Sequence, residues 1–330
     1  MSAAGPAGVV EPATETAIDR AARVLLAGGL VALPTETVYG LGADAAQRDA
    51  VERIYRTKGR PPGHPLIVHV PDLVQARRWA EVGTRAERLV TAFWPGPLTL
   101  VLPRAAGAPA WACGGQASIG LRCPSHPVAR ALLERFVALG GSGVAAPSAN
   151  RFGRVSPTRA EHVIDDLGAD APLVLDGGAA EVGVESTIVD LTRGRAVLLR
   201  PGRIGRDAIE AVLGEPVADR DAGAPRASGT LAAHYQPATP VELHAADAIE
   251  ARAAALGPAQ VAVWSARRPL AAVGHWEPAA ADAAGREAAL YEVLRRLDRL
   301  GLRRIVVEMP PTGADWDALR DRLGRAAHTG

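Results

Sequence analysis

The sequence predicts an α/β protein with two domains, and two observations carry this prediction. Short apolar runs that stop at Pro, Gly or polar residues, such as residues 30–33 and 98–102, are typical of buried strands. Between them lie segments whose apolar residues recur at helical spacing, such as residues 126–139. Because strands and helices alternate as far as about residue 210, we expect a twisted, mixed sheet with a concave site in this region.

The elements of this region follow from the same two patterns. Gly28 and Gly29 should stop the first helix, and Pro61 with Pro62 should prevent the second from continuing past Lys58. Strands are expected at residues 30–33, 66–70, 98–102, 118–122, 143–146, 173–175, 186–191 and 196–199, and helices at residues 16–27, 47–57, 71–80, 85–93, 126–139 and 156–167.

A stretch without periodic pattern divides the chain. Residues 213–240 have the composition of a linker, and His234 and Tyr235 give this linker side chains that can anchor it, so we expect it to lie over the concave site of the first domain. The first domain is then residues 1–212, and a smaller, accessory α/β domain is residues 241–330. The strands of the smaller domain end without a comparable set of polar residues, so we expect it to regulate or cover a site rather than perform chemistry.

Composition limits the cellular compartments in which the protein is expected, but it does not identify binding partners. The 330 residues carry a net charge of +1, so any basic surface for nucleic acid must be local. No apolar run approaches the roughly 20 residues that a membrane span needs. The first dozen residues resemble a frayed tail rather than a signal peptide, which points to the cytoplasm. Cys113 and Cys123 have no metal-binding spacing and are expected to be small core residues in a reducing compartment.

Residues 34–42, Pro-Thr-Glu-Thr-Val-Tyr-Gly-Leu-Gly, follow the first expected strand directly. Pro34 should end that strand because proline donates no ladder hydrogen bond, and Gly40 and Gly42 permit tight turns or close approach to a ligand. Polar side chains at the end of a buried strand are where open α/β sheets bind ligands. The alternative is a strand-to-helix turn in which threonine caps the helix.

Polar residues recur at the ends of the expected strands. Each alone has an ordinary explanation: Ser148 and Asn150 could form a turn, and Ser156 could cap the helix that follows it. Taken together, they predict that these polar side chains line one shared concave site. These residues are Thr35, Thr37, Arg122, Ser148, Asn150, Ser186 and Arg200.

Lys58 is the only lysine among 37 basic residues. A lysine that persists in an arginine-rich chain can mark a position that needs a compact point charge on a flexible stem. Chance is the alternative, as is favourable placement of a cation at a helix C-terminus. The chain has no Walker-type loop, G-x-G-x-x-G, H-E-x-x-H or nucleophile elbow. A phosphate site would therefore be assembled from Lys58, Arg60, Arg200 and hydroxyl groups.

With these residues in view, the chain resembles the YrdC-type threonylcarbamoyl-AMP synthases in their longer, two-domain form. The matching stretches occur in family order and at family spacing. They are Pro34 to Gly42, Lys58 to His69, Gly120 to Arg122, Pro147 to Asn150, Glu185 to Ile188, Arg200 to Gly202, and His234 to Pro237. The resemblance implies a YrdC-like first domain and a Rossmann-like second domain.

The resemblance also implies an activity and its residues. L-threonine, bicarbonate or CO2, and ATP (with Mg²⁺) would give threonylcarbamoyl-AMP and pyrophosphate, and downstream transfer proteins would use the product to modify tRNA, with a possible weak tRNA contact by the enzyme and no membrane contact. By analogy, threonine would be held by Thr37, His69, Arg122, the backbone of Ala146, and Ser186. ATP would be held by Lys58, Arg60, His64, Ser118, Ser148, Asn150, Ser156, Arg200 and Tyr235, with Lys58 and Arg60 as the catalytic cations and no residue assigned to a metal.

Some alternatives remain open at this point. The family usually has Asn where His64 stands, so whether His64 replaces that contact to ATP is open, and Ser228-Gly229 and Gln236 also depart from the family pattern. His69, as a lone histidine in a strand, could be a satisfied core residue. The domain could also bind RNA without catalysis. A carbamoyl-transfer module is a third reading, although such modules normally carry zinc-finger cysteines and this chain has two cysteines in all.

Overall fold

The computed structural model describes residues 8–328, which form two compact units. The first unit comprises the chain up to Phe152, Ser156–Glu181 and Glu185–Thr230. The second comprises Gly153–Val155, Val182–Val184 and the chain from Leu231 onward. The division therefore falls within the expected linker, and two short segments that precede the linker belong to the second unit.

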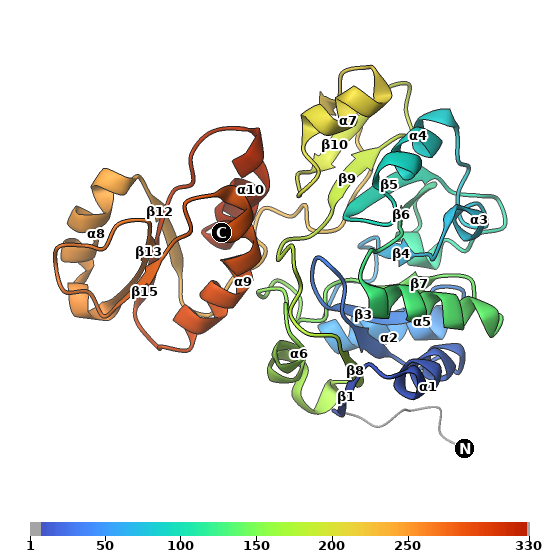
Figure 1. Ribbon diagram of the computed structural model, residues 1–330, viewed down its shortest axis with the longest axis horizontal. Helices are drawn as coiled ribbons and strands as arrows, with labels where there is room; N and C mark the ends of the chain where they lie inside the picture. Colours follow the sequence, from blue (N-terminus) through green and yellow to red (C-terminus); the bar gives the residue numbers. More distant parts are fainter. Residues whose placement is uncertain (1–7, 329–330) are drawn as a thin grey trace. The chain divides into compact units, whose positions relative to one another are not determined.

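An eleven-stranded mixed sheet forms the centre of the first unit, as the alternation of strands and helices predicts (Figure 1). Its strand order is β1-β8-β2-β3-β7-β4-β6-β5-β9-β10-β11. The strands are β1 (Val10–Pro12), β2 (Val31–Leu33), β3 (Gly40–Asp44), β4 (Ile67–His69), β5 (Leu98–Pro103), β6 (Ser118–Arg122), β7 (Val144–Ala145), β8 (Leu173–Asp176), β9 (Thr187–Asp190), β10 (Val197–Arg200) and β11 (Ala218–Asp219).

Helices cover both faces of this sheet. The helices are α1 (Glu15–Leu26), α2 (Arg48–Lys58), α3 (Leu73–Ala76), α4 (Thr84–Phe93), α5 (Pro127–Ala138), α6 (Ala160–Leu167) and α7 (Arg206–Leu213). In β2, Val31 and Leu33 pack with α1 and α5, whereas Ala32 packs with α2 and α6 on the other face. This alternation is the period of two that a strand imposes on its side chains.

Three expectations for this unit are corrected by the structure. Gly40 and Gly42 lie in strand β3, paired antiparallel with β2, because their missing side chains let neighbouring strands approach: a Cβ on Gly42 would lie 2.9 Å from Leu33 Cδ2. Ser156 does not cap a helix, because α6 begins only at Ala160. The expected frayed N-terminus is wrong for Val10–Pro12, which pair with β8; residues 1–7 lie outside the described part of the chain.

The second unit is a four-stranded parallel sheet of order β12-β15-β13-β14, also with helices on both faces (Figure 1). Its elements are β12 (Val241–His244), α8 (Ile249–Leu256), β13 (Val261–Ser265), β14 (His275–Pro278), α9 (Ala283–Asp298), β15 (Arg304–Glu308) and α10 (Asp317–Ala326). Val261, Val263 and Val306 pack with Ile249 of α8 on one face. The sequence patterns missed β14, as they missed α7 in the first unit.

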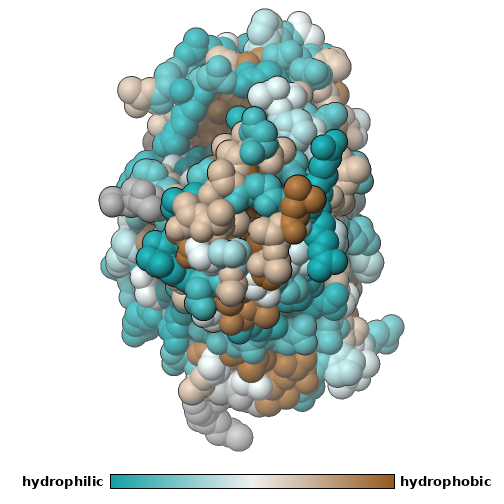
Figure 2. Space-filling model, turned by 90° about the vertical axis from the view of Figure 1, so that its left-hand side faces the viewer, coloured by the Kyte–Doolittle hydropathy of each residue, from teal (hydrophilic) through white to brown (hydrophobic). Residues whose placement is uncertain are grey.

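Hydrophilic residues predominate on the face shown in Figure 2, and hydrophobic residues form several separate groups between them. Among residues 8–328, no helix combines the length and the apolar character needed to cross a bilayer. Cys113 and Cys123 are both buried with free thiols, in agreement with the expectation that they are core residues.

Candidate functional site

Strand register brings polar residues of the first unit together at the ends of five adjacent strands. His69 in β4 is paired with Arg122 in β6, and Arg122 is paired with Thr99 in β5. Thr99 is in turn paired with Ile188 in β9, which is paired with Arg200 in β10. Paired residues as far as 89 positions apart, Thr99 and Ile188, therefore become neighbours across the sheet, and the sequence patterns alone could not give this register.

Arg122 forms a buried ion pair with Glu36, with 2.8 Å between Nη2 and Oε1. Both residues are less than 5% exposed. The contact does not have the alignment of a hydrogen bond, and among residues 8–328 neither oxygen of Glu36, nor Nε or Nη2 of Arg122, has a hydrogen-bond partner. A buried guanidinium with unused donors can accept a carboxylate.

The segment that carries Glu36 is folded by its own threonines. The hydroxyl of Thr35 donates to the Val38 carbonyl at 2.6 Å and accepts from the Val38 N–H at 3.2 Å. Its oxygen also lies 2.9 Å from the hydroxyl oxygen of Thr37, which is fully buried. This turn follows β2 directly and fixes Glu36 and Thr37 at the strand end.

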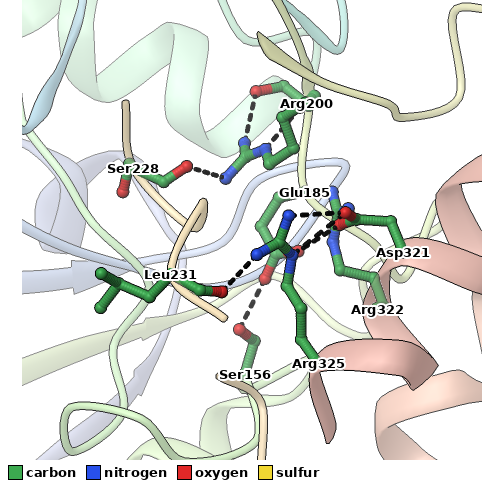
Figure 3. A network of polar contacts seen from close by, with 9 residues as sticks. Ser156, Glu185, Arg200, Ser228, Leu231, Asp321, Arg322 and Arg325 are labelled. Atoms are coloured by element: carbon green, nitrogen blue, oxygen red, sulfur yellow. Dashed lines mark hydrogen bonds and ion pairs between the residues drawn. The ribbon is translucent and has the colours of Figure 1, made fainter. Parts of the chain in front are cut away.

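Ser186 and Arg200 are joined by two hydrogen bonds. Nε of Arg200 donates to the Ser186 carbonyl at 3.0 Å, and Nη2 donates to the Ser186 hydroxyl at 3.1 Å. The same hydroxyl oxygen is 2.7 Å from Oγ1 of Thr99, which is the register partner of Arg122. Nη1 of Arg200 donates to the Ser228 carbonyl at 3.0 Å (Figure 3).

Arg60 also contacts Ser228: its Nη2 donates to the Ser228 hydroxyl at 3.4 Å. The same Nη2 donates to the Pro65 carbonyl at 3.0 Å. Its guanidinium also lies over the Phe152 ring, 5.7 Å from the centroid, and His64 contacts that ring edge-on at 5.5 Å. Burial and Arg60 lower the pKa of His64. His64 is therefore a neutral aromatic ring beside a cation at pH 7.

Lys58 is the last residue of α2, and Gly59 ends that helix in a left-handed conformation. The ammonium group is buried and donates to the carbonyls of Ser148 (2.6 Å) and Asn150 (2.5 Å). Burial is the largest cause, and Arg60 the next, of a Lys58 pKa well below its usual value. The sheet edge also includes this loop, since Ser148 is bridged to Gly40.

His69 is buried, and its Nδ1 has no hydrogen-bond partner among residues 8–328. Burial, followed by the charge of Arg122, lowers the pKa of His69 to about 3. The ring is therefore neutral at pH 7 and can offer one donor and one acceptor beside Arg122. Backbone hydrogen bonds with Val144 and Ile67 also act on this ring, so the alternative of a core histidine stays open beside the proposed role in binding.

Ser118 opens β6 and lines a small pocket with Ile67, Thr99, Ile188 and Ser228. Its volume of about 10 Å³ leaves room for about one water. Residues 226–228 form one wall of the pocket. The side-chain amide of Gln116 holds the Arg226 backbone there: its Oε1 accepts from the Arg226 N–H at 2.8 Å, and its Nε2 donates to the Arg226 carbonyl at 3.1 Å. The first part of the expected linker thus lies on the first unit, beside Arg200 and Arg60.

Three predicted site residues have other surroundings. The Ser156 hydroxyl donates to the Glu185 carboxylate at 2.6 Å (Figure 3). The backbone N–H of Ala146 donates to the Ile67 carbonyl at 3.1 Å, beside the strand that carries His69. Tyr235 belongs to the second unit, where it is buried against Tyr291 and Arg322 with a positive φ of 62°.

Residues 231–236, the second part of the expected linker, are attached to the second unit. Arg325 donates to the Leu231 carbonyl and also pairs with Asp321 (Figure 3). Gln236 donates to the His328 carbonyl at 2.7 Å. The expected linker therefore has one part fixed to each unit, and Gly229, with a φ of +73°, lies between the two parts.

Sequence reasoning missed several residues of this site. Glu36 was part of the quoted motif, and its position between two threonines was the available signal. Thr99, Phe152 and Ser228 carry no signal of their own, because register and chain folding alone bring them to the arginines. Glu185 precedes Ser186 in a quoted motif, yet its contact with Ser156 spans 29 positions of sequence.

The fold and the site define a two-domain α/β protein whose first unit gathers buried cations and hydroxyl groups at the ends of its central strands. A family profile described as telomere recombination (Sua5/YciO/YrdC) matches residues 23–202, and one described as threonylcarbamoyl-AMP synthase, C-terminal domain, matches residues 204–328. The chain belongs to the Sua5/YciO/YrdC family, in the form that carries the Sua5 C-terminal domain.

Known relatives agree with this assignment. The threonylcarbamoyl-AMP synthase of Pyrococcus abyssi is 43% identical over 239 residues, which are 71% of this chain and 69% of that protein. The Bacillus subtilis enzyme of the same name is 42% identical over 232 residues, or 68% and 66% of the two chains. The crystal structure of P. abyssi Sua5 complexed with L-threonine superposes with a TM-score of 0.87 at 35% identity, covering 97% of this chain and 96% of that one.

Proposed function

We propose that this protein synthesises L-threonylcarbamoyl-AMP from L-threonine, bicarbonate or CO2, and ATP, with release of pyrophosphate. The relatives carry the name of this activity, and the chain shares both of their domains. The observation that carries the proposal is the double hydrogen bond between Arg200 and Ser186, because it joins the residues assigned to threonine with those assigned to ATP.

Threonine is proposed to bind at Arg122, with its carboxylate on the unused donors of the guanidinium. Thr37 and Ser186 offer hydroxyl groups, and the neutral ring of His69 offers a hydrogen bond without adding charge. The backbone of Ala146 completes this set. Glu36 keeps Arg122 neutralised when the site holds no substrate.

ATP is proposed to bind beside this set, with its phosphates near Lys58, Arg60 and Arg200. His64 and Phe152 offer aromatic rings near Arg60. Ser118, Ser148, Asn150 and Ser156 are proposed as further ATP contacts because the family resemblance assigns them. Tyr235 is proposed as an ATP-binding residue on the family resemblance alone. Lys58 is suited to a phosphate oxygen because a compact ammonium held by two carbonyls still has a third N–H to donate.

The reaction requires that the substrates are positioned and that the charge of the triphosphate is neutralised. The neutral amine of threonine captures CO2, and a carbamate oxygen attacks the α-phosphorus as pyrophosphate leaves. No covalent enzyme nucleophile takes part, so Lys58, Arg60 and Arg200 serve by holding and neutralising the triphosphate. We propose that Mg²⁺ arrives with ATP, bound mainly by phosphate oxygens, as is usual for this ion. Among residues 8–328, no three His, Cys, Asp or Glu side chains are grouped to hold a metal.

The linker is proposed to cover the site during the reaction. The carbamate and the mixed anhydride both hydrolyse, so water must be kept out until the product leaves. Ser228 already contacts both Arg200 and Arg60, and Gly229 beside it is the residue at which the chain can change direction. We place the protein in the cytoplasm, where tRNA and the transfer proteins that consume the product are found.

Pyrophosphate release measured with the purified full chain tests the proposal. Release should require threonine, bicarbonate and ATP together, and omission of any one should abolish it. Exchange of the surface residue Arg303, which lies in the second unit, should leave the rate unchanged. Release without threonine would contradict the proposal. Salt-dependent RNA binding with no consumption of ATP would favour the RNA-binding alternative instead.

A further inference from the structure

A second pocket, of about 680 Å³, lies in the second unit at the carboxyl ends of its parallel strands. Its walls include Ser265 and Glu308, the last residues of β13 and β15, and the loop of residues 266–270. Ala246 and Asp247, just before α8, and Ile249 and Glu250, in its first turn, complete the lining. A volume of this size is within the range of roughly 300–1,000 Å³ that is typical of small-molecule sites.

The pocket occupies the position at which open parallel sheets bind ligands. After β12 the chain enters α8, which packs on the face of Val261 and Val263. After the neighbouring β15 it enters α10, whose Leu319 and Leu323 line the opposite face with Trp264 and Val307. Connections that leave adjacent strands toward opposite faces open a crevice between them, and the pocket lies at this crevice.

Two carboxylates fix the loop that forms one wall. Oε2 of Glu308 accepts from the Ala266 N–H at 2.8 Å, and the carboxylate of Glu250 accepts from the Leu270 N–H. The Ser265 hydroxyl donates to the Arg267 carbonyl at 2.6 Å. The loop is therefore pre-formed, and the carboxylates of Glu308 and Glu250 stabilise it by accepting hydrogen bonds from its backbone.

The remaining charged groups of the pocket are not engaged in this way. Among residues 8–328, Arg267 and Asp247 have no ion pair or side-chain hydrogen bond, and Arg268 contacts only the Trp276 ring, 5.7 Å from its centroid. A 3-10 turn at Ala246–Ala248 leads directly into α8, and the acid in the first turn of α8, Glu250, is the one that holds the loop. Leu270 lines the same pocket and is 97% exposed, which is unusual for an apolar side chain of this size.

We infer that this pocket binds a small phosphorylated metabolite of mononucleotide size. Its phosphate contacts Arg267 and Arg268, and Asp247 accepts hydrogen bonds from its hydroxyl groups. Its ring system covers Leu270 and Ile249. A free phosphate ion would leave most of the volume, and the apolar wall, unused.

Methyl NMR of the full chain, labelled at isoleucine δ1 methyls, tests this inference with adenosine monophosphate, adenosine and inorganic phosphate as probes. Ile249 lines the pocket and reports on it. Ile67 and Ile188 line the small pocket of the first unit and report separately on the proposed catalytic site, so failure at either site can be recognised. We expect adenosine monophosphate to shift the Ile249 signal saturably, with an affinity at least about tenfold above that of adenosine or phosphate.

Three variants complete the experiment. Arg267→Gln should weaken the response of Ile249 about tenfold, and Ala266→Trp, which fills the pocket from an exposed position, should abolish it. Arg303→Gln is the matched control, since Arg303 is also exposed but precedes β15 at its opposite end. An Ile249 signal that does not move, a response unchanged by Arg267→Gln, or phosphate binding as well as adenosine monophosphate would each overturn the inference.

Discussion

The carboxylate of Glu36 and the guanidinium of Arg122 meet in the interior of the first unit, 2.8 Å apart and nearly without solvent contact. Each would be a strongly unfavourable buried charge without the other. Because the contact lacks hydrogen-bond alignment, part of the donor capacity of Arg122 remains for a ligand. Glu36 therefore stabilises the buried charge of Arg122 in the empty site, and Arg122 keeps donors for the proposed threonine carboxylate.

Glu36→Gln should lower the free energy of unfolding by about 3 kcal/mol, because it leaves Arg122 buried without a counter-charge. Urea unfolding at pH 7 measures this. The matched control is Glu52→Gln, which removes the partner of Arg48 from an exposed ion pair and should change stability by less than about 0.5 kcal/mol. Equal changes in the free energy of unfolding for the two variants would show that the buried pair contributes no more to stability than the exposed one.

Arg122→Ala should weaken threonine binding by about 2–4 kcal/mol, because the threonine carboxylate would be buried without a cation. Titration calorimetry measures the affinity. Since this variant also leaves Glu36 unpaired, Arg122→Ala should be compared within a Glu36→Gln background, which separates loss of the ligand contact from loss of stability. Unchanged threonine affinity in that background would contradict the role proposed for Arg122.

Lys58→Arg should lower kcat/KM at least about tenfold although it preserves the charge. The ammonium fits between the carbonyls of Ser148 and Asn150, and a planar guanidinium cannot make the same two bonds in that space. Arg56→Lys, at an exposed position of the same helix, is the control for exchanging the two residue types. Full activity of Lys58→Arg would contradict the inference that position 58 requires a lysine.

His69 should make the stability of the protein depend on pH in a defined direction. Its pKa is about 3 when folded and about 6.5 when unfolded, so the unfolded chain binds the proton first as the pH falls. Stability associated with neutral His69 is complete above about pH 6.5 and is lost progressively from there down to about pH 3. Between pH 7 and 5, wild-type protein should lose about 2 kcal/mol more than His69→Gln. Parallel urea-unfolding profiles of the two proteins would contradict this.

Much of the fold was predictable because its signals are local. The run 118–122 was expected as a strand and is β6, and residues 173–175 were expected as a strand and lie in β8. The signal failed where the fold depends on distant partners. Gly40–Asp44 is a strand because β2 and β7 flank it, and Ser156 turns toward Glu185 instead of capping a helix.

For the site, the sequence determined which chemical groups are present: one lysine, several arginines at strand ends, and hydroxyl groups near them. The tertiary structure decided which of these groups touch. Register across five strands aligns His69, Arg122, Thr99, Ile188 and Arg200 in one row across the sheet, and burial is the largest cause of the lowered pKa of Lys58 and His69. Register and burial both depend on how the whole chain packs, so residues such as Glu36 and Ser228 acquire their partners only in the folded protein.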